Sequence, residues 1–314
     1  MLANKYKLLE KLSQGSFGKV FKAENIRTGE IVAIKTEVKI KEIKSLKMEA
    51  KIYQYLANTE GFPQLKWFGS TNNVNYLVTN LLEHSITDLV TKYGRLSIKT
   101  VLRLGAQMIE RLETLHGRYL IHRDIKPDNF MINISDKTNN VFLIDFGFCK
   151  RYNYEGNHIE FKMNKTLIGT PNYVSLNVHK GCEPSRRDDL ESCLYIMIYM
   201  LFGKFFSTEG NDLNAYKILA LKKDQLTNVP RFLTVAINYV RTLKFEEEPD
   251  YKYIIRIFSE LLEEQRALER GTIVTDEDTI ASFSEANEVE EEDEVDEANE
   301  ANEVEDDDDD YEWS

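Results

Sequence analysis

The sequence predicts an α+β fold with two lobes, a β-rich N-terminal lobe and an α-helical C-terminal lobe, followed by a disordered acidic tail. Short segments rich in β-branched and aromatic residues occupy the chain up to residue 80. Longer segments with apolar residues at helical spacing follow, and from about Gly271 the composition becomes acidic and repetitive. We therefore expect domain boundaries at 1–80, 81–270 and 271–314.

The N-terminal lobe should begin as a β-meander, because a glycine-containing turn and the turn at Asn25–Glu30 separate its first three apolar runs. The expected strands are Tyr6–Leu12, Val20–Glu24, Ile31–Ile34, Leu65–Phe68 and Asn75–Thr79. Between the third and the fourth strand, Glu42–Leu56 has helical periodicity. Its apolar stripe contains Leu46, Tyr53 and Leu56.

The C-terminal lobe should be built from helices. Ser97–His116 is amphipathic, and Ser97 is a suitable N-cap. Leu190–Phe202 is almost wholly apolar, which predicts a buried central helix. Further helices are expected near 212–223, 229–243 and 250–268.

The acidic tail dominates the formal net charge of −13. Asp276–Ser314 holds 21 Asp or Glu and no Lys or Arg. Residues 1–275 hold the other 32 acidic residues and all 40 basic ones, so the body of the chain is mildly basic at +8. Glu285–Glu290 recurs as Glu300–Glu305, and such a composition does not fold by itself. It suits either an interaction or regulatory arm or a solvating tail.

Composition and cysteine content narrow the class of protein. With 42% hydrophobic residues the chain can bury a sizeable core, and no apolar run is long enough to span a bilayer. Cys149, Cys182 and Cys193 are odd in number and lack metal-ligand spacing. They indicate free thiols in a reducing compartment, so we expect an intracellular protein of the cytoplasm, the nucleus or both. We expect no binding to membranes or nucleic acid.

Two motifs point to phosphoryl transfer. Ile121–Asn129 contains the pattern H-R-D-x-x-x-x-N, and Leu143–Gly147 contains D-F-G. Both are motifs of the protein-kinase fold, and here they follow in the expected order. The two-lobed layout agrees with that fold.

Four residues of these motifs have expected roles in the chemistry. Asp124 should accept the proton of the attacking hydroxyl or orient that hydroxyl. Lys126 can neutralise charge on the transferring phosphoryl group. Asn129 and Asp145 offer oxygen ligands for Mg²⁺ that bridges the phosphates of ATP.

The segment Ser13–Val20 lies where a nucleotide-covering loop belongs, between two predicted strands. Gly15 and Gly18 would let the backbone approach phosphates without a Cβ in the way. The kinase pattern begins with a glycine where this chain has Ser13. We assign to the nucleotide site Ser13, Gly15, Ser16, Phe17, Gly18, Val20 and Ala33.

Lys35 ends an apolar strand and can contact the α- and β-phosphates of ATP. Such a lysine needs a carboxylate partner, and both Glu42 and Glu49 fall on the apolar stripe of the next helix. Glu49 is preferred because it lies between Leu46 and Tyr53 and so faces inward.

Several segments closely resemble one group of kinases, the casein kinase 1 family. The segments that carry this resemblance are Lys126–Met131, Gly169–Asn177, Glu183–Ser192 and Pro249–Ile254. Within the second, Ser175–Asn177 stands where most kinases have Ala-Pro-Glu. The resemblance covers roughly residues 5–265 and leaves the acidic tail outside.

The resemblance implies a Ser/Thr kinase that uses Mg·ATP, needs no activation-loop phosphate and favours acidic or already phosphorylated substrates. It implies that Thr79 lies at the back of the adenine pocket and that Leu82 lies in the hinge. It also implies that Arg123, Lys150 and Lys165 form an anion site for the substrate.

The chain departs from the family at two places. Asn172 stands where a second anion pocket has an arginine, and Lys222 or Lys223 would remain of that pocket. Phe205–Ser207 replaces the usual Leu-Pro-Trp. The first departure weakens the expectation of strong binding to phosphorylated substrates, and together they indicate a divergent member.

Two other functions compete with an active kinase. One is a pseudokinase scaffold, which Ser13 favours but which the presence of Lys35, Asp124, Asn129 and Asp145 opposes. The other is a binder of basic proteins that acts through the tail alone. We expect a monomer whose tail docks either on its own kinase domain or on basic proteins.

Overall fold

The computed structural model describes residues 4–15, 18–39, 45–71, 73–134, 139–203 and 229–271. The chain divides into two units, Met1–Ala267 and Leu268–Ser314. All the elements below belong to the first unit, apart from the last residues of α8. Predictions for the following positions lie outside the described residues: Ser16, Phe17, Glu42, Phe205–Ser207, the helix at 212–223, Lys222, Lys223 and the acidic tail.

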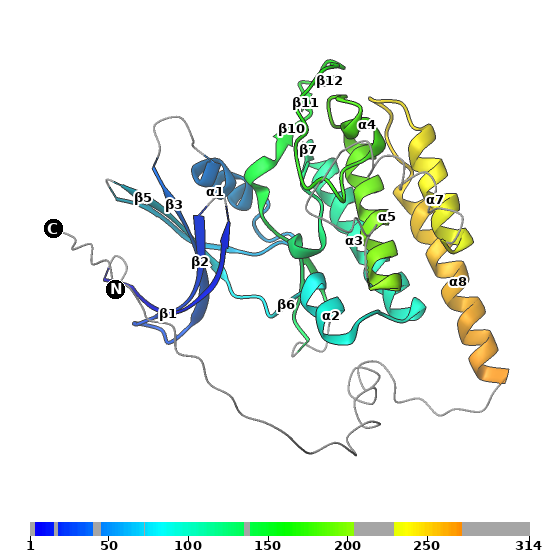
Figure 1. Cartoon of the computed structure of the whole chain (residues 1–314). Coiled ribbons are helices and arrows are strands. Elements are labelled where there is room, and N and C mark those ends of the chain that lie inside the picture. Colours follow the sequence, from blue (N-terminus) through cyan, green and yellow to red (C-terminus); the bar gives the residue numbers. More distant parts are fainter. Residues whose placement is uncertain are drawn as a thin grey trace, which may run out of the picture. The chain divides into compact units, whose positions relative to one another are not determined.

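A five-stranded antiparallel sheet forms the N-terminal lobe, with strand order β1-β2-β3-β5-β4 (Figure 1). Its strands are β1 (Tyr6–Gly15), β2 (Gly18–Asn25), β3 (Ile31–Val38), β4 (Leu65–Ser70) and β5 (Val74–Asn80). All five predicted strands are present. The first hairpin is longer than predicted, because pairing continues as far as Gly15 opposite Gly18.

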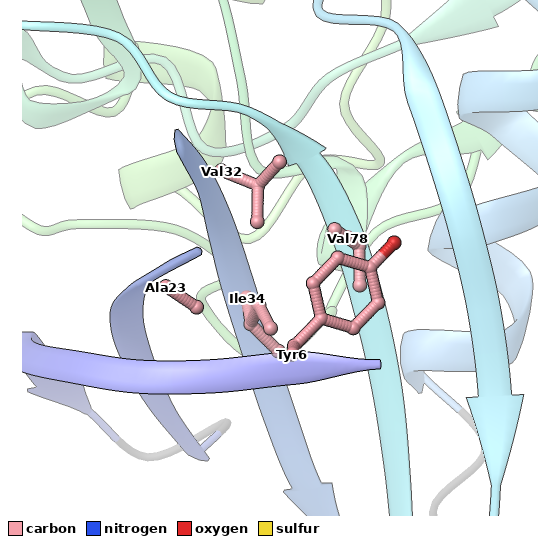
Figure 2. Close-up of a cluster of buried hydrophobic side chains, with 5 residues drawn as sticks. All are labelled: Tyr6, Ala23, Val32, Ile34 and Val78. Carbon is pink, nitrogen blue, oxygen red and sulfur yellow. The ribbon is translucent and has the colours of Figure 1, made fainter. Parts of the chain in front are cut away.

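The two faces of this sheet have different roles. Side chains alternate along a strand, so Val32 and Ile34 lie on one face of β3, while Ala33 and Lys35 lie on the other. The first face packs into an apolar core with Tyr6, Ala23 and Val78 (Figure 2). On the opposite face the register places Val20 beside Lys35 and Thr79 beside Ala33. The predicted nucleotide residues of β2, β3 and β5 therefore share one face.

Helix α1 (Ser45–Tyr55) packs against β4 and β5 and against the short helical turn η2 (Phe146–Phe148). The predicted stripe is buried, since Leu46, Tyr53 and Leu56 are each at most 4% exposed. Glu49 lies on the same stripe and is 1% exposed. Helical periodicity therefore identified the inward face of α1.

The C-terminal lobe is helical, and α5 runs through its middle against α3 and α7 (Figure 1). Its helices are α2 (Ile86–Tyr93), α3 (Ile98–Gly117), α4 (Leu176–His179), α5 (Arg186–Phe202), α7 (Arg231–Thr242) and α8 (Tyr251–Gly271). Ser97 caps α3 as predicted, its hydroxyl accepting a hydrogen bond from the Thr100 amide. Helix α5 begins one turn earlier than Leu190, because Ser185 and Asp188 form a capping box.

Short strands position the predicted catalytic segments. β6 (His84–Ser85), β8 (Phe130–Ile132) and β9 (Val141–Leu143) form one small sheet. β7 (Leu120–Ile121) pairs with β10 (Lys150–Arg151), and β11 (Asn153–Tyr154) pairs with β12 (Asn157–His158). The short turn η1 (Pro127–Asn129) lies within the H-R-D segment. In the described part of the chain, none of the helices combines the length and apolar character that crossing a bilayer requires.

Candidate active site

Lys35 joins the two lobes through two carboxylates. Its Nζ lies 2.9 Å from Glu49 Oε2 on α1 and 2.7 Å from Asp145 Oδ1, which precedes η2. The predicted pairing of Lys35 with Glu49 is therefore present. Because Glu49 is fully enclosed and Lys35 is mostly buried, this ion pair depends on the correct position of α1.

The charges of this triad sustain one another. Burial alone would lower the pKa of Lys35, but Glu49 and Asp145 outweigh burial and hold that pKa above its ordinary value. Burial raises the pKa of Glu49 to about 7, although Lys35 opposes the shift. Burial would also raise the pKa of Asp145, but the charge and hydrogen bond of Lys35 hold it below its ordinary value. Asp145 is thus a carboxylate at neutral pH.

Backbone and packing together aim Asp145. Its φ of 64° lies in the left-handed region, which is uncommon for a residue with a side chain. The next residue, Phe146, is buried, and its ring meets Tyr53 edge-on at 4.9 Å. The Tyr53 hydroxyl also accepts a hydrogen bond from the Asp145 amide at 3.3 Å. Helix α1 therefore supports Asp145 from two directions.

Asp124 is the other central carboxylate, and only 4% of it is exposed. Its Oδ2 lies 2.9 Å from Lys126 Nζ, and its Oδ1 accepts a hydrogen bond from Thr170 Oγ1 at 2.8 Å. Asn129 Nδ2 donates to the main-chain oxygen of Asp124 at 2.8 Å. The main chain of Asn129 in turn accepts from the Ile144 amide, one residue before Asp145. The H-R-D and D-F-G segments are thus side by side.

The described residues of the predicted nucleotide loop lie at the end of the first hairpin, where β1 meets β2. Ser13 pairs with Val20, and Gly15 pairs with Gly18. Gly18 has a φ of 127°, and a Cβ there would lie 1.7 Å from the main-chain oxygen of Thr36. A Cβ on Gly15 would meet nothing within 4 Å. Only glycine at position 18 lets β2 approach β3 this closely. A side chain at position 15 would instead point into open space.

The remaining residues predicted to bind the nucleotide lie on β3, on β5 and just after β5. Ala33 and Thr79 are cross-strand neighbours, and Leu82 follows the end of β5 and is buried. The model of the protein kinase domain matches residues 6–275 of this chain. The chain belongs to the protein kinase family. A protein kinase domain implies ATP as the phosphoryl donor, protein as the acceptor and typically Mg²⁺.

The kinase motif residues fit a magnesium ion held jointly with nucleotide phosphates. Asp145 is ionised, and the Asn129 side chain donates to Asp124 through its amide nitrogen, so its carbonyl oxygen remains as the ligand atom. Among the described residues, no three His, Cys, Asp or Glu side chains cluster as a metal site.

The three predicted anion-site residues gather around a carboxylate that the sequence did not indicate. Glu183, 3% exposed, lies 2.5 Å from Lys150 Nζ and 3.4 Å from Lys165 Nζ. Burial would raise the pKa of Glu183, but its hydrogen bond with Lys150 and the charge of Lys165 keep it low. Arg123 interacts electrostatically with Glu183, and its Nε donates a hydrogen bond to the main-chain oxygen of Phe148. The kinase therefore balances part of this positive cluster internally.

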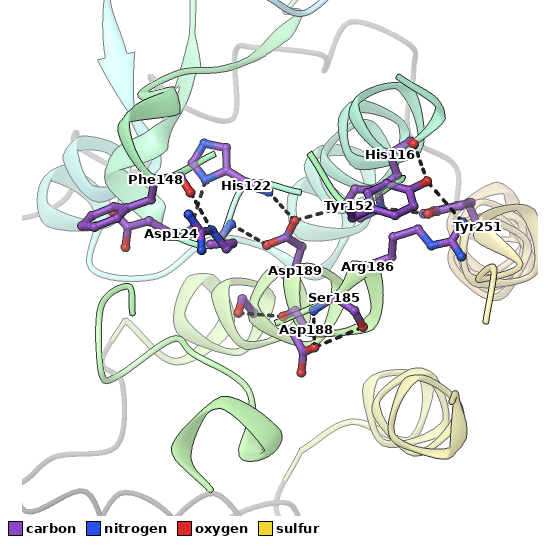
Figure 3. A network of polar contacts seen from close by, with 12 residues as sticks. His116, His122, Asp124, Phe148, Tyr152, Ser185, Arg186, Asp188, Asp189 and Tyr251 are labelled. Atoms are coloured by element: carbon purple, nitrogen blue, oxygen red, sulfur yellow. Dashed lines mark hydrogen bonds and ion pairs between the residues drawn. The ribbon is translucent and has the colours of Figure 1, made fainter. Parts of the chain in front are cut away.

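Two further residues hold the kinase catalytic loop, and sequence reasoning assigned them no such role. Thr170 lies in the recognised Gly169–Asn177 segment, but its bond to Asp124 spans 46 residues. Asp189 on α5 accepts hydrogen bonds from the main-chain amides of His122 at 2.7 Å and Arg123 at 2.9 Å (Figure 3). Asp189 lies in the recognised Glu183–Ser192 segment, but its bonds to the loop span 67 and 66 residues.

Proposed function

We propose that this chain is an active Ser/Thr protein kinase of the casein kinase 1 type. It transfers the γ-phosphate of Mg·ATP to acidic or already phosphorylated protein substrates. The observation that carries the proposal is the geometry of Asp124, which has Lys126 on one oxygen and Thr170 on the other. A pseudokinase scaffold would have no need of this arrangement together with an ionised Asp145 bound to Lys35.

Each residue has a distinct role in this proposal. Asp124 accepts the hydroxyl proton or orients the hydroxyl for in-line attack. Lys126, 2.9 Å from Asp124, lies where it can neutralise charge on the transferring group. Lys35 holds the α- and β-phosphates, and Asn129 and Asp145 are the ligands for Mg²⁺. When bound, Mg²⁺ supplies neutralisation of phosphate charge.

Specificity for Ser and Thr rests on the resemblance to casein kinase 1. Preference for acidic substrates is supported by the cluster of Arg123, Lys150 and Lys165, whose three positive charges exceed the one negative charge of Glu183. Lys150 and Lys165 are partly exposed, so an external anion can reach them. This excess is smaller than the sequence alone implied.

Replacing Asp124 tests the activity. Asp124→Asn keeps the shape of the side chain and removes the carboxylate, so transfer of labelled phosphate to casein should fall at least about 10²-fold in kcat/KM. Asp128→Asn is the matched control, because it makes the same change at an exposed position of the same loop. Phosphoamino-acid analysis of the product tests for Ser and Thr. An Asp124→Asn enzyme with unreduced activity would show that the assignment of the base is wrong.

The acidic tail is proposed to dock on the cationic substrate site of its own chain and lower activity. Its charge of −21 and the +8 of residues 1–275 support this, because a tether makes the encounter intramolecular. The alternatives are a solvating tail and a tail that binds basic proteins. A chain ending at Thr275 should show a lower KM for an acidic peptide at low salt, and equal KM values would refute docking. We further propose a monomeric intracellular protein of the cytoplasm or nucleus, with domains at 1–80, 81–270 and 271–314.

A further inference from the structure

A chain of hydrogen bonds leads from the start of α8 to the catalytic loop. The Tyr251 hydroxyl lies 2.8 Å from Nδ1 of His116, in the last turn of α3. His116 Nε2 lies 3.0 Å from Oδ2 of Asp189, the carboxylate that accepts the amides of His122 and Arg123. Figure 3 shows these side chains in line between α8 and the loop.

The direction of each hydrogen bond follows from the chemistry of the groups. Hydrogen bonds from His116 and from the His122 amide outweigh burial and hold the pKa of Asp189 low, so its carboxylate can only accept. His116 must then donate from Nε2. Burial lowers the pKa of His116 despite Asp189, which leaves the ring neutral with Nδ1 as an acceptor. Burial also raises the pKa of Tyr251, so its hydroxyl remains the donor to Nδ1.

The chain of bonds ends at the loop of His122 and Arg123, whose backbone conformation requires stabilisation. Arg123 has a φ of 68°, a left-handed conformation that is unfavourable for a residue with a side chain. Asp189 compensates by accepting the amides of both His122 and Arg123. The next residue is Asp124. A change in the position of Asp189 therefore acts directly on the backbone that aims the catalytic carboxylate.

Hydrogen bonds at Asp250 fix the start of α8, next to Tyr251. Asp250 Oδ1 accepts a hydrogen bond from the Tyr253 amide at 2.8 Å, and the Asp250 amide donates to the Tyr239 hydroxyl at 2.7 Å. Tyr251 itself is turned inward to His116 and is only 6% exposed. Its hydroxyl reaches His116 from an element that carries none of the kinase motif residues of the site.

We propose that Tyr251 is a positioning residue for phosphoryl transfer, acting through His116 and Asp189. Its hydroxyl fixes the His116 tautomer that donates to Asp189, and Asp189 fixes the loop of Asp124. The proposal rests on the kinase activity proposed above. Loss of the hydroxyl should lower kcat and leave KM for ATP nearly unchanged, because the chain of bonds from Tyr251 leads to the loop of Asp124 and not to the nucleotide face.

The test compares Tyr251→Phe with Tyr239→Phe, each assayed on casein with rates normalised to titrated active sites. Both variants lose a hydroxyl bonded at the start of α8, but only the first breaks the contact with His116. Tyr251→Phe should reduce kcat roughly three- to tenfold, since small misplacements of reacting groups are costly. Tyr239→Phe should leave kcat near the unmodified value. Equal kcat values for both variants would overturn the proposal.

A double-mutant cycle separates positioning from general stability. His116→Ala removes both the acceptor for Tyr251 and the donor to Asp189. Tyr251→Phe should then cause little further loss of kcat, whereas an equal loss in both backgrounds would mean that Tyr251 does not act through His116.

Nitrogen-15 NMR of the unmodified chain tests the contact even if a variant fails to fold or if no substrate is phosphorylated. His116 should carry its proton on Nε2, with Nδ1 unprotonated. A proton on Nδ1 would refute the assigned order of donors. Absence of transfer to casein or acidic peptides by the unmodified chain, with the expected tautomer present, would instead contradict the kinase proposal.

Discussion

In the proposed anion site, Glu183 offsets part of the positive charge, so its removal should improve substrate binding. Glu183→Gln deletes the one carboxylate that Lys150 and Lys165 share, so the charge of these residues with Arg123 rises from +2 to +3. One extra charge facing a phosphate of about −2 at roughly 7 Å gains about 1 kcal/mol in a water-like dielectric. KM for a phosphorylated peptide should therefore fall about fivefold. For an acidic peptide, the gain in binding free energy should be about half as large, so its KM should fall less.

Steady-state kinetics at low and high salt measure this effect. The gain should shrink at high salt, because exposed charges are screened within about 8 Å at physiological ionic strength. Lys165→Glu should act in the opposite direction and raise KM for acidic peptides while leaving KM for ATP unchanged. Lys162→Glu is the control, since the Lys162 side chain is 57% exposed and pairs with Glu160, while only its main-chain oxygen meets Glu183. An unchanged or higher KM in Glu183→Gln, or equal effects of the two lysine variants, would refute an anion site at this cluster.

Two further predictions concern the N-terminal lobe. Gly18→Ala should destabilise the fold by about 1–3 kcal/mol in urea unfolding, because its Cβ would collide with Thr36 at a φ of 127°. Gly15→Ala should leave stability nearly unchanged and raise KM for ATP, and the reverse pattern would contradict both assignments. Since the pKa of Glu49 is about 7, its protonation should weaken the bond to Lys35, so kcat/KM should fall as pH drops from 8 to 6. The free energy of unfolding should instead rise as pH falls, because a carboxyl group with a raised pKa in the folded state favours folding at lower pH. If kcat/KM of Glu49→Gln still falls between pH 8 and 6, another group is responsible for the titration.

The pairing of Lys35 with Glu49 could be predicted because it depends on local periodicity. The apolar stripe of α1 fixed which side of the helix faced inward, and Glu49 lay on that stripe between Leu46 and Tyr53. The positions of the five strands followed in the same way from alternating apolar runs and turn residues, but the place of β5 between β3 and β4 was not predicted. Helical or strand periodicity thus determines which face of an element is buried, independently of the elements that it meets.

The partners of the catalytic groups could not be predicted, because they come from distant parts of the chain. Glu183 meets Lys150 across 33 residues, and Thr170 meets Asp124 across 46. Tyr251 meets His116 across 135 residues. No local pattern records such contacts, since any buried polar residue could satisfy the same hydrogen bonds. The motifs therefore identify the groups expected to do the chemistry, while the tertiary fold selects the groups that aim them.

The same distinction resolves the one sequence feature that favoured a pseudokinase. Ser13 replaces a glycine of the kinase pattern, but it lies within β1 and pairs with Val20 in the hairpin. Among the described residues of this hairpin, Gly18 has a positive φ and Ser13 does not, so the backbone at residue 13 does not require glycine. Phosphates are contacted by the backbone of such a loop, which a serine side chain in an extended strand leaves intact. The departure at Ser13 therefore carries little weight against catalysis. A side chain at Gly18, in contrast, would collide with Thr36 and alter the hairpin itself.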